Sequence, residues 1–172
     1  MGRISVAIDI DAPPEAVWRV VEPVEDHVDW MRDAASIRFT TDQTRGVGTA
    51  TVVDTRVGPL HVSDHMTITE WVEGEAMGVE HTGVVTGRGR FTLRPNGRGG
   101  TRFAWDEDLH FPWWLGGPAG EAVGGRVVLA RVWRRNLLAL KHLVEEGPRS
   151  VDGERPAPVD DDGQPTDQDG QA

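Results

Sequence analysis

The sequence predicts an α+β fold in which a curved antiparallel sheet of about seven strands wraps around a long C-terminal helix. Three observations carry this prediction. The chain opens with an alternating, strand-like segment, and residues 35–111 form a series of short strand-like runs separated by turn residues. An amphipathic pattern with helical spacing follows at about residues 119–146. Because the connections between strands are short, neighbouring strands should be antiparallel.

The opening strand, expected at residues 3–11, is followed by two short helices. Its apolar face consists of Ile4, Val6, Ile8 and Ile10. Asp11, two prolines and Glu15 then mark the start of a helix, since a capping residue, proline and an acidic group are favoured in the first turn. Pro23 ends this helix, and a second short helix is expected at about residues 24–31.

Six further strands are expected between residues 35 and 111, each bounded by turn residues such as glycine, proline and asparagine. Their expected ranges are 35–41, 47–57, 60–71, 76–82, 87–94 and 101–111. Together with the opening strand they make up the predicted sheet.

A five-residue hairpin loop at residues 96–100 would set the register of the last two strands. It pairs Leu93 with Phe103, Phe91 with Trp105 and Gly89 with Glu107. The preceding hairpin would then place His81 opposite Gly89. His81 and Glu107 would flank this glycine, which has no side chain and would leave empty space for a ligand.

The long helix is predicted from apolar residues at helical spacing and ends at Gly147 and Pro148. Five glycines lie within residues 116–125, and each lowers helix propensity by about 1 kcal/mol relative to alanine. We therefore expect this segment to form the entrance to a cavity. Residues 148–172 carry seven acidic and two basic residues and almost no large apolar side chain, so they are expected to be a disordered acidic tail after a domain at 1–147.

Composition excludes several classes of function. The chain has no cysteine, so disulfides, thiolate nucleophiles and thiolate metal sites are excluded. Its net charge of −10 argues against nucleic-acid binding. No apolar run approaches the ~20 residues of a membrane helix, and the N-terminus lacks the apolar stretch of a signal peptide. A cytoplasmic protein without a membrane span is expected.

Glu107 is the leading candidate for a functional side chain. In the strand at 101–111 it shares its phase with Phe103, Trp105 and Leu109 and should therefore face the interior. A buried carboxylate is costly unless it is paired or used. Two interpretations remain open, a catalytic group or a structural ion pair with Arg126.

Two more polar residues fall in the inward phase of their strands. Asp64 lies in phase with Met66, although a bulge or strand end could instead turn it to solvent. His81 lies in phase with Val79 and would either face a pocket or cap the end of its strand. A metal site is not expected, because His61 and His65 on one strand would lie ~13 Å apart.

The order of one strand, two short helices, six strands and a long helix resembles the START/polyketide-cyclase (SRPBCC) superfamily over residues 3–146. The most specific features are residues 8–18 (IDIDAPPEAVW), Trp30 and residues 137–141 (LLALK), which look like the polyketide cyclase/dehydrase and lipid-transport branch. The resemblance implies a helix-grip fold with a cavity between the sheet and the C-terminal helix. Members bind lipids, sterols or polyketides, and some are cyclases or dehydratases.

The leading hypothesis is therefore a domain that binds a small hydrophobic or aromatic molecule, without a cofactor, in a cavity of roughly 300–1,000 Å³. The alternative is a cofactor-independent cyclase or dehydratase that uses Glu107 and His81 as acid and base. A third possibility is a protein-interaction module that uses the acidic tail or the outer sheet face. The expected cavity residues are Asp64, Met66, Val79, Gly89, Phe91, Phe103, Trp105, Leu109, Arg126, Trp133 and Leu137.

Removal of residues 148–172 should leave the melting temperature of the protein nearly unchanged, because these residues offer almost nothing to bury. Thermal unfolding of a 1–147 chain, followed by circular dichroism, checks this. A melting temperature lower by many degrees would place the domain boundary further along the chain.

Overall fold

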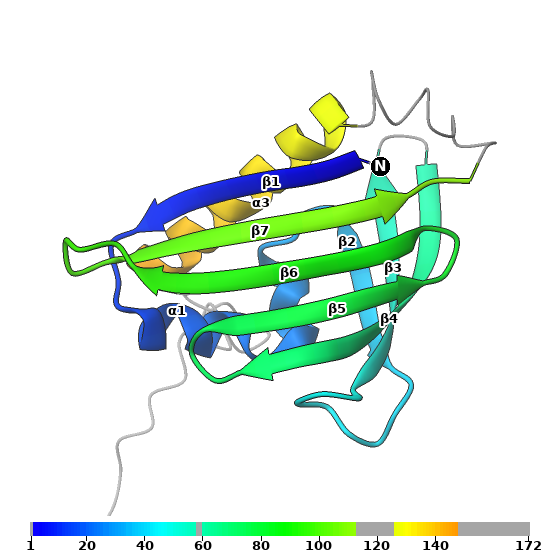
Figure 1. Cartoon of the computed structure of the whole chain (residues 1–172), viewed down its shortest axis with the longest axis horizontal. Coiled ribbons are helices and arrows are strands. Elements are labelled where there is room, and N and C mark those ends of the chain that lie inside the picture. Colours follow the sequence, from blue (N-terminus) through cyan, green and yellow to red (C-terminus); the bar gives the residue numbers. More distant parts are fainter. Residues whose placement is uncertain (1, 58–59, 113–125, 148–172) are drawn as a thin grey trace, which may run out of the picture.

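The computed structural model describes residues 2–57, 60–112 and 126–147, and these form the predicted α+β helix-grip architecture (Figure 1). The strands are β1 (Gly2–Ile10), β2 (Ala34–Phe39), β3 (Ala50–Val57), β4 (Leu60–Val72), β5 (Ala76–Thr82), β6 (Thr86–Pro95) and β7 (Thr101–His110). The helices are α1 (Pro14–Val21), the 3₁₀ helix η1 (Val24–Asp29) and α3 (Arg126–Glu146). The expected entrance at 116–125 and the expected tail lie outside the described residues.

The strands form one antiparallel sheet in the order β1-β7-β6-β5-β4-β3-β2. From β2 to β7, strands that are consecutive in the sequence are neighbours in the sheet. The first strand, β1, pairs instead with the last, β7. The helix α3 runs along β1 behind the sheet in Figure 1, and η1 lies against β2. The helices therefore cover the inner face of the sheet.

The register of the β6–β7 hairpin is the predicted one, with Gly89 opposite Glu107 and Phe91 opposite Trp105. The predicted β5–β6 register is wrong by two residues. His81 lies opposite Gly87, and Val79 lies opposite Gly89. The connection from β5 to β6 is only residues 83–85, because Thr82 already pairs with Thr86, and this moves His81 two residues closer to the end of the sheet.

Two boundaries also differ from the sequence expectation. The second short helix is a 3₁₀ helix and ends at Asp29. Strand β3 begins at Ala50 and not at residue 47, since Gly46 and Gly48 adopt φ values of 84° and 93°. Such positive φ angles are incompatible with an extended strand.

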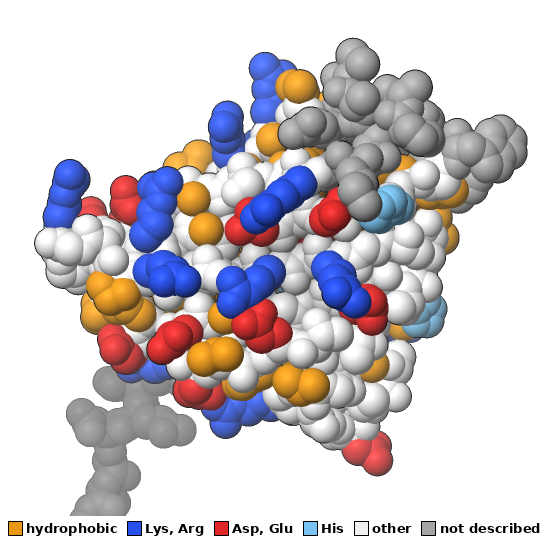
Figure 2. Space-filling view, viewed as in Figure 1, with side chains coloured by type: hydrophobic (Ala, Val, Ile, Leu, Met, Phe, Trp, Pro, Cys, Tyr) orange, Lys and Arg blue, Asp and Glu red, His pale blue; other side chains and the backbone are white. Residues whose placement is uncertain are grey.

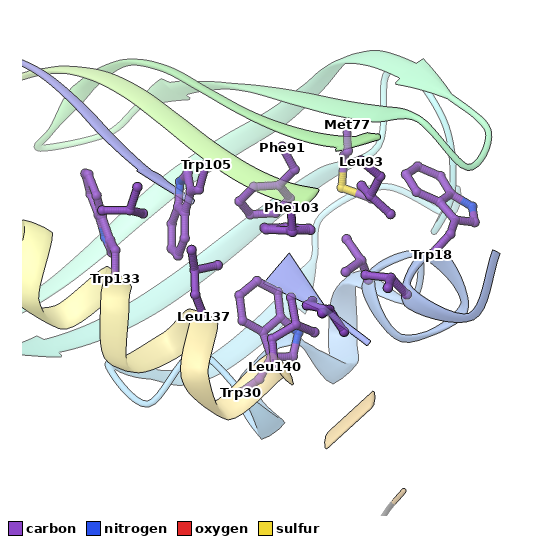
Figure 3. Close-up of a cluster of buried hydrophobic side chains, with 14 of the residues drawn as sticks. Trp18, Trp30, Met77, Phe91, Leu93, Phe103, Trp105, Trp133, Leu137 and Leu140 are labelled. Atoms are coloured by element: carbon purple, nitrogen blue, oxygen red, sulfur yellow. The ribbon is translucent and has the colours of Figure 1, made fainter. Parts of the chain in front are cut away.

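An aromatic cluster forms the centre of the core (Figure 3). Trp30 is fully buried, and its ring centroid lies 5.9–6.5 Å from those of Phe91, Phe103 and Trp105. From α3, Trp133 stacks on Trp105 with centroids 5.1 Å apart. Such aromatic pairs contribute about 0.5–1.5 kcal/mol each beyond the area they bury, so this cluster attaches α3 and the segment after η1 to the sheet.

The outer face of the sheet is covered by ion pairs, as its alternating pattern predicts (Figure 2). Cross-strand pairs include Arg90–Glu70 at 2.6 Å and Arg88–Glu80 at 3.4 Å. Exposed pairs of this kind contribute little to stability. They keep the outer face polar, and the inward phase of the same strands supplies the core.

A buried asparagine fixes α3 against the linker between η1 and β2. Asn136 is completely buried. Its Oδ1 accepts a hydrogen bond from the backbone N–H of Arg32 at 3.1 Å, and its Nδ2 donates to Asp33 Oδ1 at 2.6 Å. Sequence patterns do not predict this contact, because it joins residues more than a hundred positions apart.

Asn136→Leu should lower the free energy of unfolding by about 1–3 kcal/mol, because it leaves the Arg32 N–H and the Asp33 carboxylate without their partner. Urea unfolding measures this. The control is Leu138→Ala on the same helix, where the side chain is 49% exposed and the change should stay within about 0.5 kcal/mol. Equal effects of the two substitutions would contradict a structural role for the asparagine.

Candidate functional site

A cavity of about 80 Å³ lies between the inner face of the sheet and η1. Its walls are mostly apolar, and His81 and Glu107 are among the few polar groups. The described residues that line it are Val24, His27, Met31, Ile37, Thr51, Val53, Met66, Ile68, Met77, Val79, His81, Phe91, Trp105 and Glu107. The cavity is smaller than expected, since the rings of the aromatic cluster fill much of the space between sheet and helices.

The sequence predicted a cavity between the sheet and a long helix at about residues 119–146, of which the structure describes Arg126–Glu146 as α3. None of the residues described for α3 lines the cavity. Trp133 stacks on the face of Trp105, and Leu137 packs in the same core (Figure 3). Trp105 thus separates α3 from the cavity, and η1 and β2 form the opposite wall.

Three ionisable side chains meet in the buried interior next to this cavity. Asp64 on β4, His81 on β5 and Glu107 on β7 are only 5%, 7% and 5% exposed. The Nδ1 atom of His81 hydrogen-bonds to Oδ2 of Asp64 at 2.7 Å. On the other side of the ring, Nε2 lies 3.4 Å from Oε2 of Glu107, which is within ion-pair distance. Neither of these two atoms has a hydrogen-bond partner.

Trp105 positions this cluster, and two glycines leave room for it. The indole Nε1 of Trp105 donates a hydrogen bond to Oε1 of Glu107 at 2.8 Å. A Cβ atom on Gly89 would lie 2.6 Å from the same oxygen, and one on Gly83 would collide with Oδ1 of Asp64. The space above Gly89 is therefore occupied by the carboxylate of Glu107, whereas the sequence had suggested an empty ligand space.

The electrostatic environment keeps His81 charged at neutral pH. Burial disfavours the imidazolium and lowers its pKa, but the hydrogen bond to Asp64 and the proximity of Glu107 outweigh this effect. The net result is a pKa of His81 raised from 6.5 to about 9. With Nδ1–H committed to Asp64, the second proton on Nε2 is held towards Glu107 and the cavity.

A second histidine, His27, lines the cavity and is neutral at pH 7. Burial lowers the pKa of His27 to about 4, and the hydrogen bond to the carbonyl of Val21 opposes this only in part. The neutral ring therefore donates from Nε2 to that carbonyl at 2.6 Å. Sequence reasoning missed His27, although in the helix that the sequence predicts at about residues 24–31 its spacing from Val24 and Met31 would place all three on one face.

The other predicted site residues divide into three groups. Met66, Val79, Phe91 and Trp105 line the cavity together with His81 and Glu107. Phe103, Leu109, Trp133 and Leu137 are buried in the core but do not border the cavity in the described structure, and Asp64 lies behind His81. The side chain of Arg126, the proposed partner of Glu107, lies outside the described part of the structure.

Asp64 faces the interior, so the alternative in which a bulge turned it to solvent is wrong. The bulge in this part of β4 lies later, between Ile68 and Glu70, and leaves the phase of Asp64 unchanged. Within residues 2–57, 60–112 and 126–147, no three His, Asp or Glu side chains are grouped as metal ligands. Nor is any described helix both long and apolar enough to cross a membrane.

Residues 1–145 match the family described as polyketide cyclase / dehydrase and lipid transport. The chain belongs to this family. The fold of this chain recurs in a START superfamily protein from Mycobacterium smegmatis, with a TM-score of 0.69, 15% sequence identity, and coverage of 84% of this chain and 97% of that one. No curated protein matches the sequence.

Two further solved structures have the same fold. A protein from Thermus thermophilus has a TM-score of 0.68 and 18% identity, and the alignment covers 83% of this chain and 96% of that one. The Aha1 dimer from Colwellia psychrerythraea has a TM-score of 0.62 and 16% identity, with 86% and 98% coverage. At these identities the structures establish only that this chain has the helix-grip fold. Its site must be interpreted from its own residues.

The stability of the protein should be greatest near pH 6.5 and fall on both sides. The raised pKa of His81 contributes stability below pH 6.5 that is lost as the pH rises through about 9. The lowered pKa of His27 has the opposite sign, so stability falls as the pH decreases from 6.5 towards about 4. Each effect is on the order of 3 kcal/mol at most, and urea unfolding at a series of pH values measures both.

Variants assign the two arms of this pH profile. His81→Gln should flatten the decline above pH 6.5, and His27→Gln should flatten the decline between pH 6.5 and 4.5. His142→Gln, at an exposed position on α3, should leave the profile unchanged. If the decline towards pH 9 persists in the His81 variant, another group is responsible for it.

Proposed function

We propose that this protein binds a small hydrophobic or aromatic molecule in the cavity between the sheet and η1. The observation that carries the proposal is the composition of the cavity wall. Apolar side chains enclose the space, and at one side Oε2 of Glu107 and Nε2 of His81 lack hydrogen-bond partners. Ligand sites typically combine such an apolar wall with a few polar groups that orient the ligand.

The lining also explains how a cavity of about 80 Å³ could admit a larger molecule. Met31, Met66 and Met77 all contribute to the wall. Methionine side chains are unbranched and flexible, and they adapt to irregular shapes at low cost. Membership of a family named for cyclases, dehydrases and lipid transport supports a ligand-binding role.

The methionines provide a direct test. Three of the four methionines in the chain border the cavity, so NMR spectra of ¹³C-methyl-methionine protein report on its contents. Titration with neutral one-ring aromatics such as toluene should shift these methyl signals in a saturable manner. A complete lack of saturable shifts with such probes would overturn the proposal.

A matched pair of variants identifies the binding location. Val53→Phe places a ring into the cavity wall and should reduce toluene affinity at least about tenfold, at an overpacking cost of about 1–3 kcal/mol in stability. Val47→Phe makes the same change at a position that is 58% exposed and should leave the affinity unchanged. Equal affinities of the two variants would place the ligand elsewhere.

A second candidate function is a cofactor-independent dehydratase or cyclase, and the protonation state of His81 favours it. His81 is oriented by Asp64 and carries a proton at neutral pH, as a general acid requires. Glu107 would accept a proton from carbon, and His81 would protonate the departing hydroxyl, which leaves as water. Both groups border the same cavity, so one bound molecule could contact both.

Glu107→Gln tests the catalytic alternative, because it preserves the shape of the side chain and removes the base. If the protein is an enzyme of this kind, the substitution should reduce turnover by a factor of about 10²–10⁴ and leave methyl-methionine spectra and ligand affinity for apolar probes close to those of the wild type. Undiminished turnover would exclude the proposed role of Glu107.

A further inference from the structure

We infer that the site selects ligands that carry a hydroxyl group and places that hydroxyl between His81 and Glu107. This inference rests on the proposed function and specifies the chemical class of the ligand. It derives from the hydrogen-bonding atoms that the buried cluster leaves unused at the cavity. Oδ1 of Asp64 also lacks a partner, but Asp64 is not among the described residues that line the cavity.

The cluster offers the cavity one donor and one acceptor that face each other. At neutral pH His81 is an imidazolium that donates its Nδ1–H to Asp64, so its remaining N–H is on Nε2. Glu107 accepts the Trp105 indole N–H on Oε1, so its remaining acceptor is Oε2. Both remaining atoms are buried and lack a hydrogen-bond partner, and leaving such groups unpaired costs about 1–3 kcal/mol each.

The distance between these two atoms suits a single bridging group. They lie 3.4 Å apart, too far for a strong direct bond. An oxygen atom beside them can lie at about 2.8 Å from both, which is the ordinary length of such bonds. The bridging atom must accept a hydrogen bond from Nε2–H and donate one to Oε2.

Among common ligand groups, the hydroxyl meets both requirements through one atom. A ketone oxygen accepts but cannot donate to Glu107. An ammonium group donates but cannot accept from His81. A carboxylate accepts from His81 and places a second negative charge beside Glu107, with Asp64 also behind the ring, so it should be repelled.

The rest of the wall does not offer a competing anchor of this type. His27 is neutral, and its Nε2–H is bound to the Val21 carbonyl. Thr51 is the other polar residue that borders the cavity in the described structure, and most of the remaining wall is aliphatic, aromatic or methionine. The hydroxyl of the ligand therefore defines its orientation, with the apolar body directed towards η1 and β2.

Three probes of similar shape test this inference, with toluene, p-cresol and 4-methylbenzoate each titrated at pH 7 against ¹³C-methyl-methionine protein. In the wild type, p-cresol should bind at least about tenfold more tightly than toluene, because it completes two hydrogen bonds. The signal of the Trp105 indole N–H should shift as well, since Trp105 shares Glu107 with the ligand. The anion 4-methylbenzoate should bind more weakly than toluene.

The variant Glu107→Gln separates this effect from general hydrophobicity. The amide oxygen keeps the hydrogen bond from the Trp105 N–H, so an NH₂ group, which cannot accept, replaces Oε2. This should reduce the advantage of p-cresol over toluene to less than about threefold. It should also strengthen binding of 4-methylbenzoate relative to toluene, because the repelling charge is gone. Glu80→Gln makes the same chemical change on the residue before His81, at an ion pair with Arg88 on the outer face of the sheet, and should leave all three affinities unchanged.

The outcomes distinguish the inference from the proposed function beneath it. If toluene and p-cresol bind equally well to the wild type, or if the advantage of p-cresol survives in the Glu107 variant, the hydroxyl inference is wrong and the binding function stands. If none of the three probes gives saturable shifts, the binding function itself is overturned, and the inference with it. The wild-type comparison decides the matter even if the variant fails to fold.

Discussion

The rest of the structure depends on the contacts of one side chain, the indole ring of Trp105. One face of the ring stacks on Trp133 and so attaches α3 to the sheet. The ring also packs against Phe91 and Trp30 at the centre of the core. Its N–H holds the carboxylate of Glu107 at the cavity wall. A single side chain thus joins the packing of the long helix to the geometry of the candidate site.

The cluster of Asp64, His81 and Glu107 is expensive for a fold of this kind. Burial of ionisable groups stabilises a protein less than well-packed apolar residues of similar size would. The cluster also constrains its surroundings, because Gly83 and Gly89 have to lack side chains to make room for the two carboxylates. The rest of the architecture needs no charged group at this position. The proposed role in recognition or proton transfer would account for this arrangement.

Sequence reasoning predicted the parts of the site that depend on strand periodicity. Glu107 had to face the interior, since alternation along β7 permits no other phase without a bulge. The position of His81 was only partly predictable, because the pairing of β5 with β6 depends on the length of the loop between them. The location and size of the cavity could not be derived. They depend on how η1 packs against β2 and on the rotamers of Trp30, Phe91 and the methionines, and no local pattern encodes these.

The pairing of β1 with β7 also affects how the chain reaches this structure during synthesis. Residues 2–10 hydrogen-bond to residues 101–109, about a hundred positions later in the chain. A ribosome that adds 5–20 residues per second exposes β1 for roughly 5–20 s before its partner strand exists. During that time its apolar side, which includes Ile4, Val6 and Ile10, has no sheet to join. The nascent chain therefore carries β1 without its partner strand until the last hairpin emerges.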